Sequence, residues 1–179
     1  MDNHKYDVKN LSHGGQYVLF DFIWDTTKEI FISSHNFILN LFIQDKKKHH
    51  GNHVFADFIW DVTKDNLDGE DFSDHVFGDF VFETMKKAIQ QTNMTIVHSK
   101  LCILGEGKSP KGFCLVHLID ESHSTAHCYT ERGLLALDIF TCGGTNPVPV
   151  IEYTVKEIQK KYPSLKCTYI QNHNRFHHL

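Results

Sequence analysis

The chain has 179 residues, of which 41% are hydrophobic and 22% are charged, and its formal net charge is −4. This length suits one globular domain rather than two, and the slight acidic balance gives no basic field for binding nucleic acid. Histidine stands out at 14 copies, and it is both a common metal ligand and the side chain that titrates near neutral pH.

The cysteines and the apolar stretches indicate the compartment. Five cysteines are dispersed without a CxxC pair, which favours a reducing compartment over a disulfide framework. Residues 1–10 lack the apolar core of a secretory signal. The longest apolar stretch, residues 30–43, is shorter than the ~20 residues of a membrane-spanning helix and is interrupted by polar side chains. We therefore expect a soluble, cytoplasmic protein with no membrane partner.

A short internal repeat marks the first part of the chain. Asp-Phe-Ile-Trp-Asp occurs at residues 21–25 and again at 57–61, and in both copies Thr-Lys follows after one intervening residue. Two copies do not make a solenoid, so the repeat is interpreted as a partial duplication of one strand and its turn. This interpretation divides the chain into an N-terminal extension, residues 1–50, and a main domain, residues 51–179.

Hydrophobic patterns predict the elements of the main domain. Strands are predicted where β-rich runs lie between turn residues, at 53–60, 95–104, 113–119, 134–140 and 167–171. Helices are predicted where apolar residues recur at helical spacing, at 74–91 and 150–161. Strands outnumber helices, so the expected fold class is α+β, a layered sandwich of a mainly antiparallel sheet with helices packed on one face.

The segment between the third and fourth predicted strands carries the chemical groups. Residues 120–131 read Asp-Glu-Ser-His-Ser-Thr-Ala-His-Cys-Tyr-Thr-Glu, and the thiol of Cys142 follows just before a Gly-Gly pair. A nucleophile near a base is the usual arrangement for covalent catalysis. A polar hairpin loop is the alternative interpretation, and composition alone leaves both open.

The order and spacing of these residues resemble the short, prokaryotic-type S-adenosylmethionine decarboxylases, a pyruvoyl-dependent family. The resemblance covers about residues 51 to 162. Upstream, Pro110-x-Gly112 lies at the family's distance from Ser122, and Gly51-x-His53-x-x-x-Asp57 resembles its first strand. The central match is Glu121-Ser122-His123-x-x-x-His127-x-x-x-Glu131, followed by Ala136-Leu137-Asp138-Ile139-Phe140-Thr141-Cys142-Gly143.

The resemblance implies a proenzyme that cuts itself between Glu121 and Ser122, giving chains of residues 1–121 and 122–179. Ser122 would become a pyruvoyl group, which forms a Schiff base with the substrate amine, so that no separately bound cofactor is needed. By the same resemblance, His127 transfers a proton during processing. Cys142 is the corresponding proton donor in decarboxylation. The family commonly forms a homodimer of processed αβ units, which we expect here.

The resemblance also assigns substrate contacts, with one departure. Glu131 aligns with the carboxylate that holds the ribose hydroxyls of the nucleoside. Where the family usually has an aromatic residue for adenine stacking, this chain has Lys108, and either Phe113 or a phenylalanine of the extension is a candidate to replace that aromatic ring. The expected substrate is S-adenosylmethionine, whose decarboxylation supplies the aminopropyl donor for spermidine.

Two alternatives stay open at this stage. A pyruvoyl enzyme on the same scaffold could decarboxylate ornithine or arginine, with Glu131 pairing with a cation. An idle homologue could serve as a regulatory partner of an active decarboxylase, although retention of Ser122, His127 and Cys142 together favours the enzyme. No metal is expected, because the histidine pairs 49–50 and 177–178 lie in polar segments without a second ligand pair. For His123, structural and functional roles are both open.

Overall fold

The computed structural model describes residues 51–63, 72–105, 109–120, 122–142 and 144–175. The N-terminal extension, and with it the first copy of the repeat, lies outside these residues. The elements in chain order are strand β1 (Gly51–Ile59), helix α2 (Asp74–Gln90), strands β2 (Ile96–Leu104), β3 (Gly112–Ile119) and β4 (Ser122–Tyr129), a short 3-10 helix (Thr130–Arg132), strand β5 (Leu134–Thr141), helix α3 (Val148–Lys161) and strand β6 (Lys166–Arg175).

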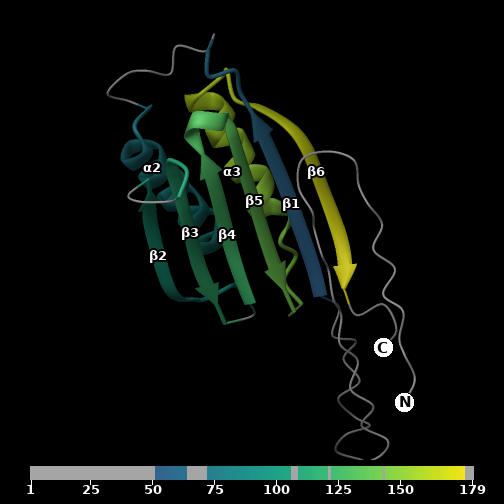
Figure 1. Cartoon of the computed structure of the whole chain (residues 1–179). Coiled ribbons are helices and arrows are strands. Elements are labelled where there is room, and N and C mark those ends of the chain that lie inside the picture. The colour runs from purple at the N-terminus through teal and green to yellow at the C-terminus, as the bar shows by residue number, and fades with distance from the viewer. Residues whose placement is uncertain (1–50, 64–71, 106–108, 121, 143, 176–179) are drawn as a thin grey trace, which may run out of the picture.

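The strands form one six-stranded sheet in the order β2-β3-β4-β5-β1-β6. Every neighbouring pair is antiparallel. Both long helices lie behind the same face of the sheet, and among the described residues no helix covers the opposite face (Figure 1). This arrangement confirms the expected α+β class with helices on one face. In the described part of the chain, no helix is long and apolar enough to cross a membrane.

The hydrophobic core lies between the sheet and the two helices. Phe77 of α2 is 0% exposed and stacks on Phe72 with ring centroids 4.8 Å apart. Its ring also meets Phe113 of β3 edge-on at 5.5 Å and Tyr162, which follows α3, at 5.1 Å. One side chain therefore joins both helices to the sheet, and burying a ring of this size contributes about 1.5–3 kcal/mol.

Local sequence explains where the helices begin. Ser73 caps α2, because its Oγ accepts a hydrogen bond from the backbone N–H of Val76 at 3.2 Å. The predicted helix at 74–91 is thus confirmed almost to the residue. Helix α3 begins at Val148, two residues before the predicted start, with a proline in its first turn. Proline fits there because the first turn of a helix leaves its N–H groups unpaired.

Two expectations about strands were wrong. Residues 122–129, expected to connect two strands, form β4, which pairs with β3 on one side and β5 on the other. Small side chains alternate toward the helices, so the polar residues between them lie on the face without helices. Strand β6 runs to Arg175 rather than ending near residue 171, because it pairs with β1 along its whole length.

Candidate active site

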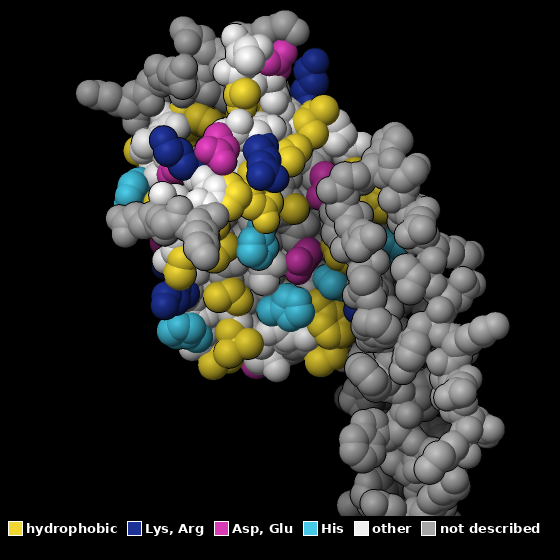
Figure 2. Space-filling view, in the orientation of Figure 1, with side chains coloured by type: hydrophobic (Ala, Val, Ile, Leu, Met, Phe, Trp, Pro, Cys, Tyr) yellow, Lys and Arg dark blue, Asp and Glu magenta, His cyan; other side chains and the backbone are white. Residues whose placement is uncertain are grey.

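The sheet face opposite the two helices, which we call the open face, carries polar side chains near the middle of the sheet. Along β4, Ser124, Ala126 and Cys128 are buried toward the helices, whereas His123, Thr125 and His127 alternate with them and point to the open face. The open face shows histidine side chains gathered around an acidic one near its middle (Figure 2). A site on this face has a rigid sheet as its floor.

Ser122 and Cys142 lie at the same end of the sheet. Ser122 is the first residue of β4, and its Cα partner on β5 is Thr141, the residue directly before Cys142. Ser122 is partly buried, whereas Cys142 is exposed. The backbone φ of Ser122 is +157°, at the margin of a region that residues with a side chain seldom adopt. The register thus places the predicted nucleophile and the predicted thiol donor next to each other. Glu121 lies outside the described residues.

His127 and Glu131 lie at the other end of β4. His127 is exposed and is five residues along the strand from Ser122. At a rise of about 3.3 Å per residue, the two Cα atoms are about 17 Å apart. Glu131 is exposed in the short 3-10 helix that follows β4. The predicted site residues therefore form two groups in one chain rather than one.

The turn that carries Glu131 depends on Gly133, which has φ +66°. A Cβ on this residue would lie 2.0 Å from the carbonyl oxygen of Trp60, so only glycine fits. The backbone N–H of Trp60 donates to the carbonyl of Gly133 at 3.0 Å, and Thr130 donates to Asp74 of α2 at 2.6 Å. These contacts fix the end of β4 to the rest of the domain.

A shallow cavity of about 200 Å³ opens beside His127. Lys100 and Cys102 of β2 and Cys114 of β3 line it with His127, and Cys114 is the Cα partner of His127. Burial raises the pKa of the Cys114 thiol, and the neighbouring Cys102 raises it further. Small-molecule sites usually measure about 300–1,000 Å³, so this cavity is too small to enclose a nucleoside by itself.

Of the two candidates for the stacking ring, Phe113 does not fit, and the other, a phenylalanine of residues 1–50, lies outside the described residues. Phe113 is 0% exposed and lies on the helix side of β3, where it packs against Phe77. Its ring is part of the core and is not available to a ligand on the open face. Lys108 lies outside the described residues.

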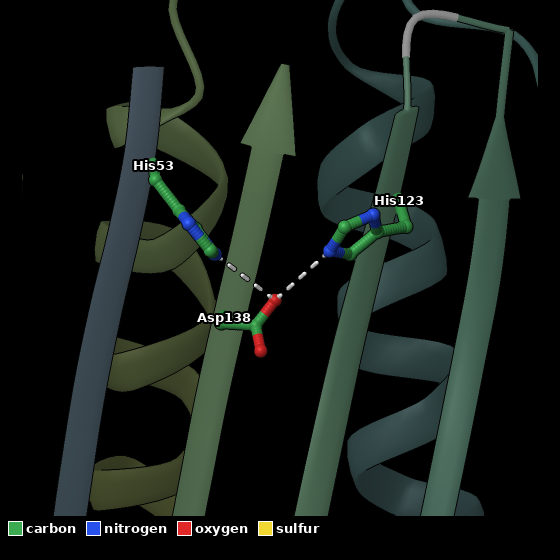
Figure 3. A group of neighbouring side chains, drawn as sticks. All are labelled: His53, His123 and Asp138. Carbon is green, nitrogen blue, oxygen red and sulfur yellow. Dashed lines mark ion pairs between the residues drawn. The ribbon is translucent and has the colours of Figure 1, made fainter. Parts of the chain in front are cut away.

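A second polar group occupies the open face close to Ser122. The Asp138 carboxylate of β5 lies between two imidazoles, His53 of β1 and His123 of β4 (Figure 3). Its Oδ1 is 3.6 Å from His53 Nε2 and 3.7 Å from His123 Nε2. Its Oδ2 accepts a hydrogen bond from Thr125 at 2.8 Å. We call these three residues, His53, His123 and Asp138, the imidazole–carboxylate cluster.

Burial and neighbouring charges shift the pKa of one member of this cluster, His123. Burial lowers the pKa of His123, the Asp138 carboxylate opposes that shift, and His53 adds to it. His53 is only 9% exposed, and its Nε2 and Asp138 Oδ1 are both buried without a hydrogen-bond partner. Buried polar atoms without partners are rare, so this pair of facing atoms calls for an explanation.

The cluster also has the ligand types of a metal site, since its ligand atoms lie within 4.8 Å of one another. The guanidinium of Arg175 argues against a metal. Its Nη1 lies 3.4 Å from His53 Nδ1, and a guanidinium can only donate. His53 Nδ1 must accept, so its proton is on Nε2, the nitrogen that a metal would need.

The role of Asp138 was missed at the sequence level, although the residue lies in the matching run. A signal was present, because it is the one carboxylate in the otherwise apolar strand Leu134–Thr141. A charged residue there implies a partner on the same face. Finding that partner required the register between β1, β4 and β5.

An antiparallel six-stranded sheet with one helical layer, and a serine at the start of its central strand β4, defines a two-layer α+β protein. A sequence model described as S-adenosylmethionine decarboxylase matches residues 52–169. The chain therefore belongs to the S-adenosylmethionine decarboxylase family.

Curated relatives carry the same description. A region of 61 residues is 43% identical to the S-adenosylmethionine decarboxylase proenzyme of Carboxydothermus hydrogenoformans, covering 34% of this chain and 48% of that protein. Another of 78 residues is 32% identical to the proenzyme of Sulfolobus acidocaldarius, covering 43% of this chain and 60% of that protein. These alignments span about half the length of the relatives.

Among solved structures, the chain is similar to an adenosylmethionine decarboxylase from Aquifex aeolicus. The two are 22% identical with a TM-score of 0.44, and the match covers 72% of this chain and 90% of that one.

Proposed function

We propose that the protein is a self-processing, pyruvoyl-dependent decarboxylase of S-adenosylmethionine. Membership of the family supports this function, and the observation that carries it is the placement of Ser122 beside Cys142, within the region that the family model matches. Neither alternative, a decarboxylase of ornithine or arginine or an idle regulatory homologue, gains support from the family model or the relatives. The product is the aminopropyl donor for spermidine synthesis.

Self-cleavage between Glu121 and Ser122 suits the position of the bond. Because β4 begins at Ser122, a cut there leaves every strand whole. Residues up to 121 keep β1, α2, β2 and β3, and residues from 122 keep β4, β5, α3 and β6. The two pieces stay joined through the β3–β4 and β1–β5 pairings.

The residues around Ser122 fit a pyruvoyl group formed from it. Such a group supplies a carbonyl that takes up the substrate amine and accepts the electrons released as CO₂ leaves. Cys142 is exposed one residue beyond the Cα partner of Ser122, and this position supports a role for its thiol in returning a proton to the substrate carbon. Glu131 holds the ribose hydroxyls.

The separation of about 17 Å between Ser122 and His127 supports a site that is shared between two copies of the chain. In a homodimer with the open faces packed together, Ser122 and Cys142 of one copy meet His127 and Glu131 of the other. The small cavity beside His127 is then half of a larger site. Exposed apolar side chains on the open face support the packing: Ile59, Leu118, Leu134 and Tyr169, each 41–46% exposed.

The reaction takes place in the cytoplasm on a small molecule. The test is release of labelled CO₂ from S-adenosylmethionine, ornithine and arginine by the full chain, with Ser122→Ala as the control. We expect CO₂ from S-adenosylmethionine alone, and none with the control. Release from ornithine or arginine only would contradict the substrate, and release by Ser122→Ala would contradict the pyruvoyl chemistry.

A further inference from the structure

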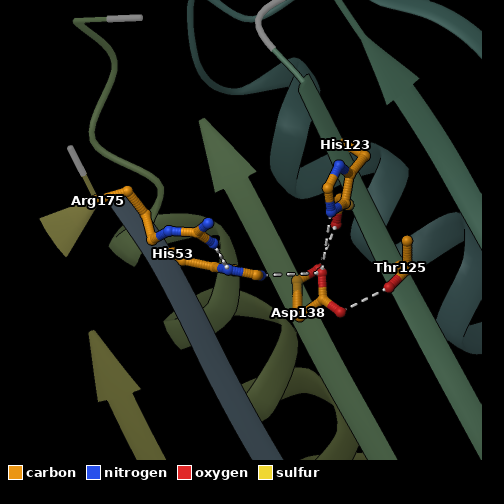
Figure 4. Close-up of polar contacts among 6 residues, drawn as sticks. His53, His123, Thr125, Asp138 and Arg175 are labelled. Carbon is orange, nitrogen blue, oxygen red and sulfur yellow. Dashed lines mark hydrogen bonds and ion pairs between the residues drawn. The ribbon is translucent and has the colours of Figure 1, made fainter. Parts of the chain in front are cut away.

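The imidazole–carboxylate cluster has no part in the roles assigned so far, although it lies one residue from Ser122. Together with Arg175 it brings side chains from β1, β4, β5 and β6 to one place on the open face (Figure 4). The order of contacts is Arg175, His53, Asp138, His123, with Thr125 on the far oxygen of the carboxylate. This chain of contacts fixes where the protons are.

The proton of His53 is placed by Arg175. Because the guanidinium donates to His53 Nδ1, the imidazole proton is on Nε2. That Nε2–H lies 3.6 Å from Asp138 Oδ1, and both atoms are buried and lack a closer partner. The Asp138 carboxylate is therefore fixed at Oδ2 by the hydrogen bond from Thr125, and its Oδ1 faces the Nε2–H of His53. The carboxylate is oriented before any substrate arrives.

The oriented carboxylate in turn orients His123. Its Nε2 is 3.7 Å from the same Oδ1, and a carboxylate favours the tautomer that carries the proton on the facing nitrogen. Nδ1 is then left with its lone pair, on the side of the ring turned away from Asp138. A base held by a third group is the arrangement that activates catalytic imidazoles, and contacts of this length shorten in substrate complexes.

The neighbours of His123 keep it ready to accept a proton. The charged or titratable groups that face it are Asp138 from β5 and His53 from β1, and its apolar neighbours are Phe140 of β5 and Leu118 of β3. Burial holds the pKa of His123 below its usual value, so the ring is uncharged at neutral pH.

His123 is covalently bonded to the reacting residue, because it directly follows Ser122 in the chain. After cleavage, residue 122 is a chain end bonded to the backbone nitrogen of His123. The α-amino group of a substrate is largely protonated at neutral pH and must lose a proton before its nitrogen attacks a carbonyl. We propose that His123 is the general base of this step and that Asp138 is its positioning residue. One N–H bond of the ammonium breaks, its proton moves to His123 Nδ1, and the electron pair stays on the substrate nitrogen.

This proposal rests on the proposed function, but its first test does not need activity. Long-range ¹⁵N–¹H NMR of the full chain reports the tautomer and pKa of each histidine. We expect Nε2–H for both His53 and His123, and a lower pKa for His123 in Asp138→Asn. An Nδ1–H tautomer at His123 would overturn the proposal. So would stoichiometric Zn²⁺ binding that removes both Nε2–H signals, since this would make the cluster a metal site.

The second test is the pH profile of decarboxylation. We expect His123→Gln to lower kcat about 100-fold and to abolish the acid limb of the profile, the fall in rate at low pH that protonation of the base causes. Asp138→Asn should lower kcat and move that limb to lower pH, because its carboxylate raises the pKa of His123. His98→Gln, an exposed histidine on edge strand β2, should change neither.

The outcomes separate the two claims. A wild-type chain that releases no CO₂ refutes the proposed function and leaves the NMR result to decide the tautomers. An active wild type with unchanged kcat and acid limb in both His123→Gln and Asp138→Asn refutes the general base. If His123→Gln has the melting temperature of wild type but is not cleaved, the pH profile of Asp138→Asn decides between the outcomes. An acid limb displaced to lower pH supports the proposal, and an unchanged acid limb contradicts it.

Discussion

Ser122 and His127 lie at opposite ends of β4, so two inactive variants should restore each other if every site is shared between two copies. The variants are Ser122→Ala and His127→Ala, expressed alone and together. In a mixed dimer, one site combines Ser122 and Cys142 of the His127→Ala chain with His127 and Glu131 of the Ser122→Ala chain, and is intact. The other site lacks both residues.

The expected magnitude follows from this geometry. When two chains are made equally and pair at random, about half of the dimers are mixed, and one site in two is intact in each of them. The co-expressed pair should therefore recover about one quarter of the wild-type sites, whereas neither variant alone has any. Labelled CO₂ release per mole of chain measures the fraction. Two different affinity tags confirm that mixed dimers form.

A matched pair serves as the control. Ser122→Ala and Cys142→Ala remove residues from the same end of the sheet, so a mixed dimer has no intact site and should release no CO₂. Recovery by this pair, or no recovery by the Ser122→Ala and His127→Ala pair despite mixed dimers, would refute the two-copy site. Activity of His127→Ala alone would remove His127 from the chemistry.

Three further predictions concern the fold. Phe77→Ala should lower the free energy of unfolding by about 3–5 kcal/mol in urea titrations, because the ring is fully buried between both helices and the sheet. Val97→Ala, at an exposed position, should change it by less than about 0.5 kcal/mol, and equal effects of the two variants would contradict the packing. His117 is 0% exposed and forms hydrogen bonds with Ser99 and with the Phe82 carbonyl, and burial lowers its pKa. The unfolded chain therefore binds one more proton than the folded chain, so the free energy of unfolding should fall as the pH drops below about 6.5. His117→Gln should flatten that dependence, and an unchanged slope would show that other groups cause it. Gly133→Ala should lower the melting temperature through the clash with the Trp60 carbonyl, and a variant as stable as wild type would contradict the turn geometry.

The strongest local patterns predicted the helices and most strands. Phe77, Val81 and Met85 recur at helical spacing, and α2 buries all three. Strand β4 could not be predicted in this way, because Thr125 is its one β-branched residue and it forms by pairing on both sides with β3 and β5. The end of β6 was missed for the same reason, since its asparagines disfavour strands and its pairing with β1 decides.

The candidate site residues were predicted from a family resemblance in their order and spacing, but their arrangement depends on register. Ser122 and Cys142 are 20 positions apart in sequence, and antiparallel pairing of β4 with β5 brings them to one end of the sheet. The same pairing keeps His127 away from Ser122, although only five positions separate them. Sequence spacing alone does not show which of these residues lies beside Ser122, because this depends on residues 122–129 forming a strand.

The central claim is that the chain cuts itself before Ser122, and the intact mass of the purified full chain tests it most directly. We predict two fragments, residues 1–121 and 122–179, with the second lighter by one ammonia than the fragment that simple hydrolysis would give. The Ser122→Ala chain should stay whole. A wild-type chain that remains a single species with an ordinary serine at position 122 would contradict the account.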